Sequence, residues 1–273
     1  MKAFIHDNKD LKNIIRETSE IAGYLWQRGW AERNASNISV NVTDLFQPEI
    51  SEYSSFPFYS LTVSYSRLAG NFFFVTGTGK RMRDLARKPM KNALVLRLNE
   101  NASGYWIISQ KVDGENFMPT SELPTHLGIH QMIAERGSAE KVVMHTHPHE
   151  LVTLSHAKQF CNEDVLNKLL WSMHPETVMF VPKGVGFVPY CLPGSMEIAA
   201  ETIKSLQNHD VALWEKHGVF AIGKSVADTF DVIDILAKSA KIYFLCRSAN
   251  FVPESFTDEQ LSELRKLAEG FRL

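Results

Sequence analysis

Two histidines separated by one residue, His145 and His147, stand at the end of a short apolar run. Alternate residues of a strand point to the same face, so both imidazoles could bind one metal ion. Alone, the pair is equally compatible with one histidine in the core and one that caps the next helix. His217 shifts this balance, because the flanking Trp214 and Phe220 indicate a buried segment that can supply a third nitrogen. Three histidines leave an open coordination position, which is typical of catalytic zinc.

The other histidines are less suited to this metal. His149 is expected in the first turn of the following helix, either at the surface or beside the ligands. The remaining histidines lack comparable spacing, and each is expected to be exposed or to have its hydrogen bonds satisfied: His126, His130, His156, His174 and His209.

An acid that could move a proton stands in Met118-Pro119-Thr120-Ser121-Glu122-Leu123-Pro124, just before a predicted helix. The ordinary interpretation of this segment is a helix start. The functional interpretation is that Glu122 acts as a general acid or base close to the metal. Thr120 and Ser121 could then bind an anion at the helix N-terminus.

Two further segments carry groups that bind phosphate. Thr76-Gly77-Thr78-Gly79-Lys80 follows a predicted strand and opens a probable helix, so backbone amides and hydroxyls could cradle an anion. Its spacing is not that of a Walker motif, and glycine turns are common. Arg33-Asn34-Ala35-Ser36-Asn37 offers polar side chains before a strand, with a turn rich in asparagine as the alternative interpretation.

The hydrophobic pattern predicts the elements that must position these side chains. Apolar alternation or short apolar runs predict strands near 38–42, 61–65, 72–75, 93–98, 105–109, 142–144, 177–181 and, around Lys216-His217-Gly218, two strands within 211–222. Helical spacing predicts helices at 11–29, 127–137, 151–156 and 196–206. Capping signals, Ser225 with Asp228 and Thr257 with Gln260, predict two more. The segment 43–58 is expected to be irregular. The mixture of predicted strands and helices predicts one α/β domain spanning 1–273, with a mixed sheet covered by helices.

Composition excludes some partners. Among 273 residues, 29 basic and 31 acidic residues give a net charge of −2 without a basic stripe, which argues against nucleic acid and membrane surfaces as partners. The three cysteines are widely spaced, so neither a disulfide framework nor a cysteine metal site is expected. The polar start resembles no signal peptide, and no run of about 18 apolar residues occurs. A cytoplasmic location is expected.

The motifs taken together resemble one family. Their order is Glu-Arg-Asn-x-x-Asn, Val-Thr-Gly-Thr-Gly-Lys, Pro-Thr-Ser-Glu-Leu-Pro-x-His, His-x-His and His-Gly-Val-Phe, and it resembles the class II aldolase and adducin family from about Gly29 to the helix after Ser225. Within that family the chain is similar to the members that reversibly cleave L-rhamnulose 1-phosphate to dihydroxyacetone phosphate and L-lactaldehyde.

The resemblance implies a three-layer fold with a central, largely antiparallel sheet flanked by helices, a four-fold symmetric homotetramer and active sites at subunit boundaries. It implies one Zn²⁺ per subunit, held by His145, His147 and His217, and a proton moved by Glu122. The substrate phosphate would be bound by Asn34, Asn37, Thr78, Thr120 and Ser121. Glu176 matches an acid that reaches the site from a neighbouring subunit. The chain has His149 where the family has a small polar residue, and Ala35-Ser36 where it more often has Gly-Gly.

Four alternatives share this resemblance. They are a fuculose-1-phosphate type of aldolase, a pentulose-phosphate 4-epimerase, a methylthioribulose-phosphate dehydratase and a non-enzymatic adducin-like scaffold. Such epimerases typically carry aspartate at the position of Glu122, so the acid favours an aldolase. The presence of all three histidines argues against a scaffold.

Overall fold

The computed structural model describes residues 8–46, 53, 55–109 and 117–270. Its centre is a nine-stranded sheet in the order β2-β5-β4-β3-β1-β6-β9-β8-β7, in which every neighbouring pair is antiparallel except β7 with β8. The strands are β1 (Asn37–Asn41), β2 (Phe58–Ser60), β3 (Phe72–Thr76), β4 (Ala93–Leu98), β5 (Gly104–Ile107), β6 (Val142–Thr146), β7 (Val185–Val188), β8 (Val211–Trp214) and β9 (Gly218–Gly223). The expected largely antiparallel sheet is therefore confirmed.

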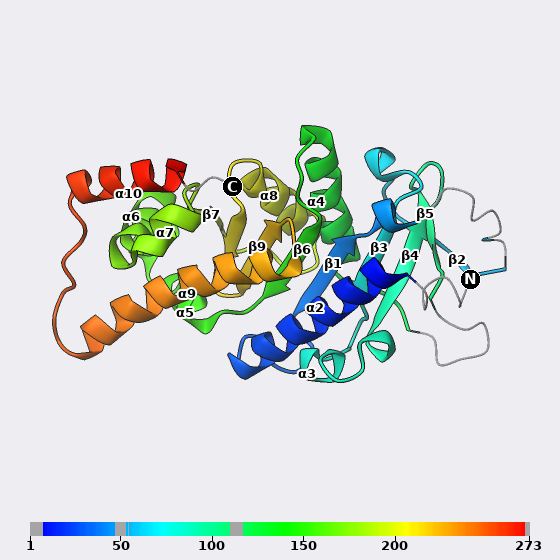
Figure 1. The fold of residues 1–273 in the computed structure, drawn as a ribbon, viewed down its shortest axis with the longest axis horizontal. Coiled ribbons are helices and arrows are strands. Elements are labelled where there is room, and N and C mark those ends of the chain that lie inside the picture. Colours follow the sequence, from blue (N-terminus) through cyan, green and yellow to red (C-terminus); the bar gives the residue numbers. More distant parts are fainter. Residues whose placement is uncertain (1–7, 47–52, 54, 110–116, 271–273) are drawn as a thin grey trace.

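Helices cover both faces of this sheet (Figure 1). They are α2 (Lys9–Gln27), α3 (Met82–Leu85), α4 (Leu123–Arg136), α5 (His149–Leu154), α6 (Glu163–Met173), α7 (Pro175–Phe180), α8 (Met196–Leu206), α9 (Val226–Ser248) and α10 (Asp258–Gly270). Short 3₁₀ turns occupy Thr43–Leu45, Ser66–Leu68, Pro89–Lys91 and Lys158–Cys161. Within the described ranges, every helix is too short or too polar to span a lipid bilayer.

The two-residue period of the strands divides the core into two layers. Ile38 and Val40 of β1 pack with α2 and α9 on one face. Val143 of β6 and Phe220 of β9 pack with α4 and α8 on the other face. Because neighbouring positions of a strand point to opposite faces, Asn37, Ser39 and His145 must lie on the α4 side. This alternation decides which polar residues can meet around the site.

Local signals explain several helix ends. The Ser225 hydroxyl accepts a hydrogen bond from the Asp228 amide over 3.0 Å and starts α9. Thr257 and Gln260 cap α10 reciprocally, through hydrogen bonds of 2.9 and 3.2 Å. Helix α4 ends at Gly137, whose φ of 64° suits glycine. These predicted boundaries are confirmed, as is the helix predicted at 196–206.

The strand predicted at 61–65 is wrong. The edge strand β2 covers Phe58–Ser60, and the alternating residues that follow have no partner strand. Val63 is exposed, while Tyr65 turns inward and donates its hydroxyl to the carbonyl of Pro124 over 3.0 Å. The prediction of an irregular segment at 43–58 falls partly on 47–52 and 54, which lie outside the described residues.

The strand predicted at 177–181 is also wrong, because this segment belongs to helix α7. Pro175 occupies the first helical turn, where its restricted φ favours a helix, and Thr177 bonds Ser239 of α9 over 2.6 Å. Tertiary packing thus overrides the β-propensity of this segment. Helix α6 and strand β7 were not anticipated by the sequence pattern.

Candidate metal centre and active site

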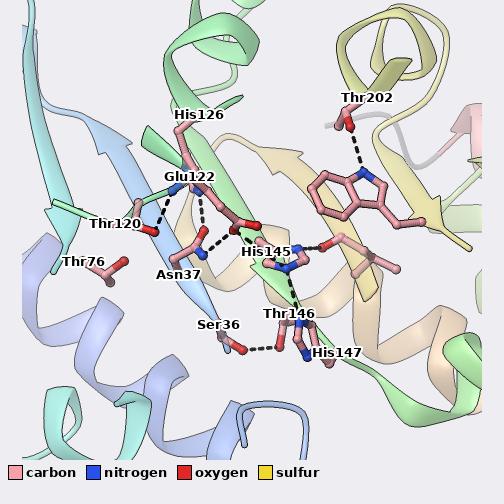
Figure 2. Close-up of polar contacts among 12 residues, drawn as sticks. Ser36, Asn37, Thr76, Thr120, Glu122, His126, His145, Thr146, His147 and Thr202 are labelled. Carbon is pink, nitrogen blue, oxygen red and sulfur yellow. Dashed lines mark hydrogen bonds and ion pairs between the residues drawn. The ribbon is translucent and has the colours of Figure 1, made fainter. Parts of the chain in front are cut away.

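Three histidines meet at one end of the central strands. His145 is the fourth residue of β6, His147 follows the end of that strand, and His217 lies in the turn between β8 and β9. One ring nitrogen from each lies within 4.8 Å of the other two. The predicted pair on one face is therefore joined by a third imidazole from a segment about 70 positions away. Figure 2 shows His145 and His147 pointing to the same region.

The outer ring nitrogens of two histidines are held by acceptors. His145 Nδ1 lies 2.9 Å from the carbonyl of Val219, and His147 Nδ1 lies 2.8 Å from Oε1 of Glu32. A carbonyl and a carboxylate only accept, so each Nδ1 carries the proton. The two Nε2 atoms then present lone pairs to each other at 3.1 Å, an arrangement that a bound cation stabilises. The residues present therefore fit a metal ion.

The protonation of these imidazoles also suits metal binding. Burial lowers the pKa of His145 well below its usual value and lowers the pKa of His217 to about 4. Both rings are thus neutral at pH 7, the form that donates a nitrogen lone pair to a metal. Trp214 packs against His145 and His217 at ring-centroid distances of 5.2 and 5.1 Å, and its indole donates to Thr202 over 2.7 Å. The indole thus limits the movement of both rings.

The turn that carries His217 is shaped by unusual backbone geometry. Lys216 has a φ of 60°, and its amide donates to the Ser155 hydroxyl over 2.7 Å. At Gly218 a Cβ atom would lie 2.5 Å from the carbonyl oxygen of Thr146, so only glycine fits this position. The His-Gly sequence therefore has a steric reason.

Glu122 occupies the position just before α4, beside the histidines, and its side chain makes no capping hydrogen bond. Its Oε2 lies 3.9 Å from Nε2 of His145 and accepts a hydrogen bond of 2.6 Å from Nδ2 of Asn37 (Figure 2). Burial raises the pKa of Glu122, although the Asn37 hydrogen bond and nearby His147 oppose the shift. A carboxyl group with a raised pKa beside a metal can both accept and return a proton.

The five residues expected at the substrate phosphate share one pocket with the histidines and Glu122. The lining comprises Asn34, Ala35, Ser36, Asn37, Gly77, Thr78, Gly79, Thr120, Ser121, Glu122, His145, His147 and His217. Backbone hydrogen bonds join the loop at 77–79 to the loop at 120–122. The Thr78 amide donates to the carbonyl of Met118 and the Thr120 amide to the carbonyl of Thr76, each over 2.9 Å. Hydroxyls, amides and imidazoles thus line the same pocket.

The pocket loop at 33–37 does not need two glycines. Its positive φ falls on Arg33, at 51°, and neither Ala35 nor Ser36 adopts such a conformation. Ser36 is buried, and its hydroxyl lies 3.1 Å from the Trp30 carbonyl and 3.0 Å from the Thr146 hydroxyl. Ala35-Ser36 in place of Gly-Gly is therefore compatible with this loop.

Two predicted residues lie outside the pocket. Glu176 belongs to the first turn of α7, where its Oε2 lies 3.0 Å from Nε2 of His174. His149 is exposed, and its Nε2 lies 3.4 Å from Oε1 of Glu150 rather than beside the other histidines. The expectation that His149 is at the surface or beside the ligands is met by an exposed ring.

The sequence reasoning missed several residues around the site. Glu32 belongs to the Glu-Arg-Asn motif but had no expected role, although its carboxylate accepts a hydrogen bond from Nδ1 of His147. Ser39 also had no expected role, although its hydroxyl contacts His126 and His130. Both rings are buried and hydrogen-bonded, which agrees with the expectation that they are either exposed or have their hydrogen bonds satisfied. The signal available in the sequence was the spacing of His126 and His130 by four positions, which places both side chains on one face of α4.

Comparisons with known proteins agree with this geometry. The family described as "Class II Aldolase and Adducin N-terminal domain" matches residues 16–244. The chain is 44% identical over 265 residues to a rhamnulose-1-phosphate aldolase of Bacteroides thetaiotaomicron, covering 97% of each chain. It is 32% identical over 259 residues to one from Klebsiella pneumoniae strain 342, covering 94% of this chain and 91% of that one.

A solved structure gives the same result at the level of the fold and the family. The crystal structure of a sugar-phosphate aldolase from Thermotoga maritima superimposes with a TM-score of 0.76 at 33% identity, covering 89% of this chain and 99% of that one. The family match over residues 16–244 contains every histidine and loop of the pocket. The chain described here belongs to the class II aldolase and adducin family.

Proposed function

We propose that this protein is a zinc-dependent aldolase that reversibly cleaves L-rhamnulose 1-phosphate to dihydroxyacetone phosphate and L-lactaldehyde. The observation that carries the proposal is one pocket that holds three clustered histidines, Glu122 and two hydroxyl-lined loops. The substrate is inferred from the 44% identity over 97% of the chain to a protein named for this activity. The whole chain is proposed to form one catalytic domain.

Nε2 of His145, Nε2 of His147 and a ring nitrogen of His217 would hold the metal. When bound, the metal supplies a Lewis acid that stabilises negative charge on the oxygens of the reacting ketone. Glu32 and the carbonyl of Val219 keep the outer nitrogens protonated, so that the inner nitrogens stay available as ligands. Three nitrogen ligands fit the preference of zinc and leave a coordination position open for substrate.

Glu122 is proposed to carry the proton. In the cleavage direction the bond between C3 and C4 breaks, and its electron pair remains on the C3 side. The C4 hydroxyl gives its proton to solvent water and becomes the aldehyde, while protonated Glu122 delivers a proton to C3 and so completes dihydroxyacetone phosphate. Glu122 then takes up a proton from water before the next cleavage. Burial favours the protonated carboxyl group that this step consumes, and the reverse reaction restores it.

The hydroxyl-lined loops are proposed to bind the substrate phosphate. Asn34, Thr78 and Ser121 are exposed to the pocket, and Thr120 lies behind them. Asn37 already uses one amide hydrogen on Glu122, which leaves its second hydrogen for the substrate. Binding the distant phosphate orients C3 towards Glu122 and so contributes to catalysis through positioning.

The proposal extends to the assembly. A four-fold symmetric homotetramer in the cytoplasm, with Glu176 reaching a neighbouring active site, follows from the family resemblance. Glu176 lies outside the pocket of its own chain, which is compatible with a role at another subunit.

The decisive experiment compares ketose 1-phosphates as substrates. L-Rhamnulose 1-phosphate and L-fuculose 1-phosphate yield the same two products, so cleavage rates must be combined with synthesis. We expect faster cleavage of the rhamnulose ester, and synthesis from dihydroxyacetone phosphate and L-lactaldehyde should give the C4 configuration of rhamnulose. The fuculose configuration would overturn the substrate assignment. Interconversion of pentulose phosphates without release of an aldehyde would instead identify an epimerase. Zinc content measured on the purified protein tests the metal.

A further inference from the structure

Two fully buried histidines lie behind the pocket, where the proposed reaction does not use them directly. His126 and His130 are four positions apart on α4, and both point towards β1. Their exposed fractions are 0% and 2%, and burial lowers the pKa of each to about 3. Both rings are therefore neutral at pH 7. A neutral histidine has one donating and one accepting nitrogen, so its neighbours decide its tautomer.

A continuous series of hydrogen bonds links these histidines to the proposed acid. Asn37 Nδ2 donates to Glu122 Oε2 over 2.6 Å, and Asn37 Oδ1 is hydrogen-bonded to Nε2 of His126 (Figure 2). Nδ1 of His126 lies 2.7 Å from the Ser39 hydroxyl, which lies 2.8 Å from Nε2 of His130. Asn37 and Ser39 are two positions apart on β1 and so share the face that α4 covers.

The direction of every bond in this series follows from its end at Glu122. In its ionised form, which takes up the proton, the Glu122 carboxylate only accepts hydrogen bonds, so Asn37 must present its NH₂ group to Oε2 of Glu122 and its oxygen to His126. Nε2 of His126 must then carry the proton, which leaves Nδ1 as an acceptor. The Ser39 hydroxyl has a single hydrogen and must donate it to that Nδ1.

The hydrogen bond between Ser39 and His130 also has a fixed direction. Since the only hydrogen of the Ser39 hydroxyl points to His126, its oxygen must accept a hydrogen bond from Nε2 of His130. The bonds therefore run in one sense, from His130 through Ser39, His126 and Asn37 to Glu122. A flipped Asn37 amide would place an oxygen against the carboxylate and an NH₂ group against a protonated nitrogen.

We propose that Ser39, His126 and His130 are positioning residues that lock the Asn37 amide so that it holds the Glu122 carboxyl group beside the metal ligands. The catalytic role of these three residues rests on the proposed aldolase function, whereas the histidine tautomers follow from the hydrogen bonds alone. The aromatic rings of Phe220 and Phe73 pack against His126 and His130, with ring centroids 5.5 and 4.8 Å apart. This apolar packing makes an unpaired ring nitrogen costly and so favours one arrangement of the series.

Three variants separate positioning from general stability. Ser39→Ala removes the hydroxyl that donates to Nδ1 of His126, and His126→Leu removes the link to Asn37. His126→Gln retains an NH₂ group that can reach the Asn37 oxygen. The control is Ser239→Ala, which removes another fully buried hydroxyl, hydrogen-bonded to Thr177 over 2.6 Å on α9 and outside the pocket.

For Ser39→Ala and His126→Leu we expect kcat for cleavage to fall by about tenfold to a hundredfold, as misplacement of a reacting group does. Zinc content should stay close to that of the parent, and KM should change less than kcat, because Asn37 is only one of the five residues proposed at the phosphate. His126→Gln should recover most of kcat, and Ser239→Ala should keep the parental kcat even if it unfolds at lower temperature. Unchanged kcat in folded Ser39→Ala would overturn the proposal, as would equal losses in Ser39→Ala and Ser239→Ala.

A second measurement does not depend on any substrate. Chemical shifts of ¹⁵N in labelled histidine distinguish protonated from bare ring nitrogens, and we expect His126 and His130 of the parent to carry their protons on Nε2. In Ser39→Ala, Nε2 of His126 should keep its proton, and the shift of Nδ1 should change because this nitrogen loses its hydrogen-bond donor. A proton on Nδ1 of His126 in the parent would overturn the proposal. A parent that cleaves no ketose 1-phosphate would instead contradict the proposed function and leave the tautomer result intact.

Discussion

Asn37 lies directly opposite His145 in the antiparallel pairing of β1 with β6. One side chain of this pair holds the proposed proton carrier, Glu122, and the other is a proposed metal ligand. The two groups that must cooperate on one substrate are therefore held by adjacent strands in fixed register. A rigid sheet of this kind keeps catalytic groups in place without loop closure.

Removing any one of the three clustered histidines should remove the metal. His145→Ala, His147→Ala and His217→Ala each delete one of three nitrogens that lie within 4.8 Å of one another. His149→Ala is the matched control, because this neighbouring histidine is exposed and paired with Glu150. Elemental analysis of the purified variants measures the outcome. Full zinc occupancy in folded His217→Ala would refute the site.

Glu122→Gln should keep the metal and the binding of dihydroxyacetone phosphate but lose proton transfer. The amide preserves the shape of the side chain and cannot carry the proton, so the rate should fall by roughly 10²-fold to 10⁴-fold. The measurement is the exchange of a solvent deuteron into dihydroxyacetone phosphate without aldehyde, which isolates proton transfer from carbon–carbon chemistry. Parental exchange in the zinc-loaded variant would show that another residue is the base.

Glu32→Ala should weaken metal binding without removing a ligand. Glu32 Oε1 lies 2.8 Å from Nδ1 of His147, and loss of such an outer partner typically costs about 10-fold to 100-fold in affinity. Glu32→Gln keeps an oxygen acceptor and should be less affected. Glu135→Ala, on the exposed side of α4, controls for the loss of a surface charge. Competition with a chelator measures the affinities, and equal values for Glu32→Ala and Glu135→Ala would contradict this role.

Stability should decline in acid because of the buried histidines. The pKa of His130 is about 3 in the folded protein, against an ordinary value of 6.5. Between these values the unfolded chain binds the proton and the folded protein does not, so the free energy of unfolding falls as pH decreases. Each such histidine contributes at most about 1.4 kcal/mol per pH unit.

His130→Gln tests this directly, because glutamine does not titrate and can still donate to Ser39. Below pH 6 the pH dependence of its unfolding free energy should be shallower than that of the parent by up to about 1.4 kcal/mol per pH unit. Urea unfolding at several pH values and one protein concentration measures both proteins. Parallel pH profiles would show that His130 is not buried in its neutral form.

The proposed tetramer and the role of Glu176 can be tested by mixing subunits. We expect Glu122→Gln and Glu176→Gln to be impaired separately, because each removes a different acid from a shared site. Co-assembly in equal amounts should restore roughly a quarter of the sites if each site combines two neighbouring subunits. Light scattering measures the assembly. A fully active monomer, or no recovery in confirmed mixed tetramers, would exclude a shared site.

The residue types and their local spacing, with the family resemblance, were sufficient to propose the chemistry. His145 and His147 were predicted to share a face because strand geometry alone requires it. Ser225 and Thr257 marked two helix starts, since capping depends on residues three positions apart. The family motifs supplied the candidate acid and the phosphate loops. All of these inferences use short stretches of chain or recognised patterns.

The contacts around the site were decided by the tertiary structure. Asn37 was expected at the phosphate, yet its amide binds Glu122, 85 positions away, and His126. Glu32 reaches His147 across 115 positions. Such pairings depend on the order of strands in the sheet and on which helix covers which face, and no local pattern encodes either. For the same reason the segment at 177–181, strand-like in composition, becomes helix α7 where it packs against α9.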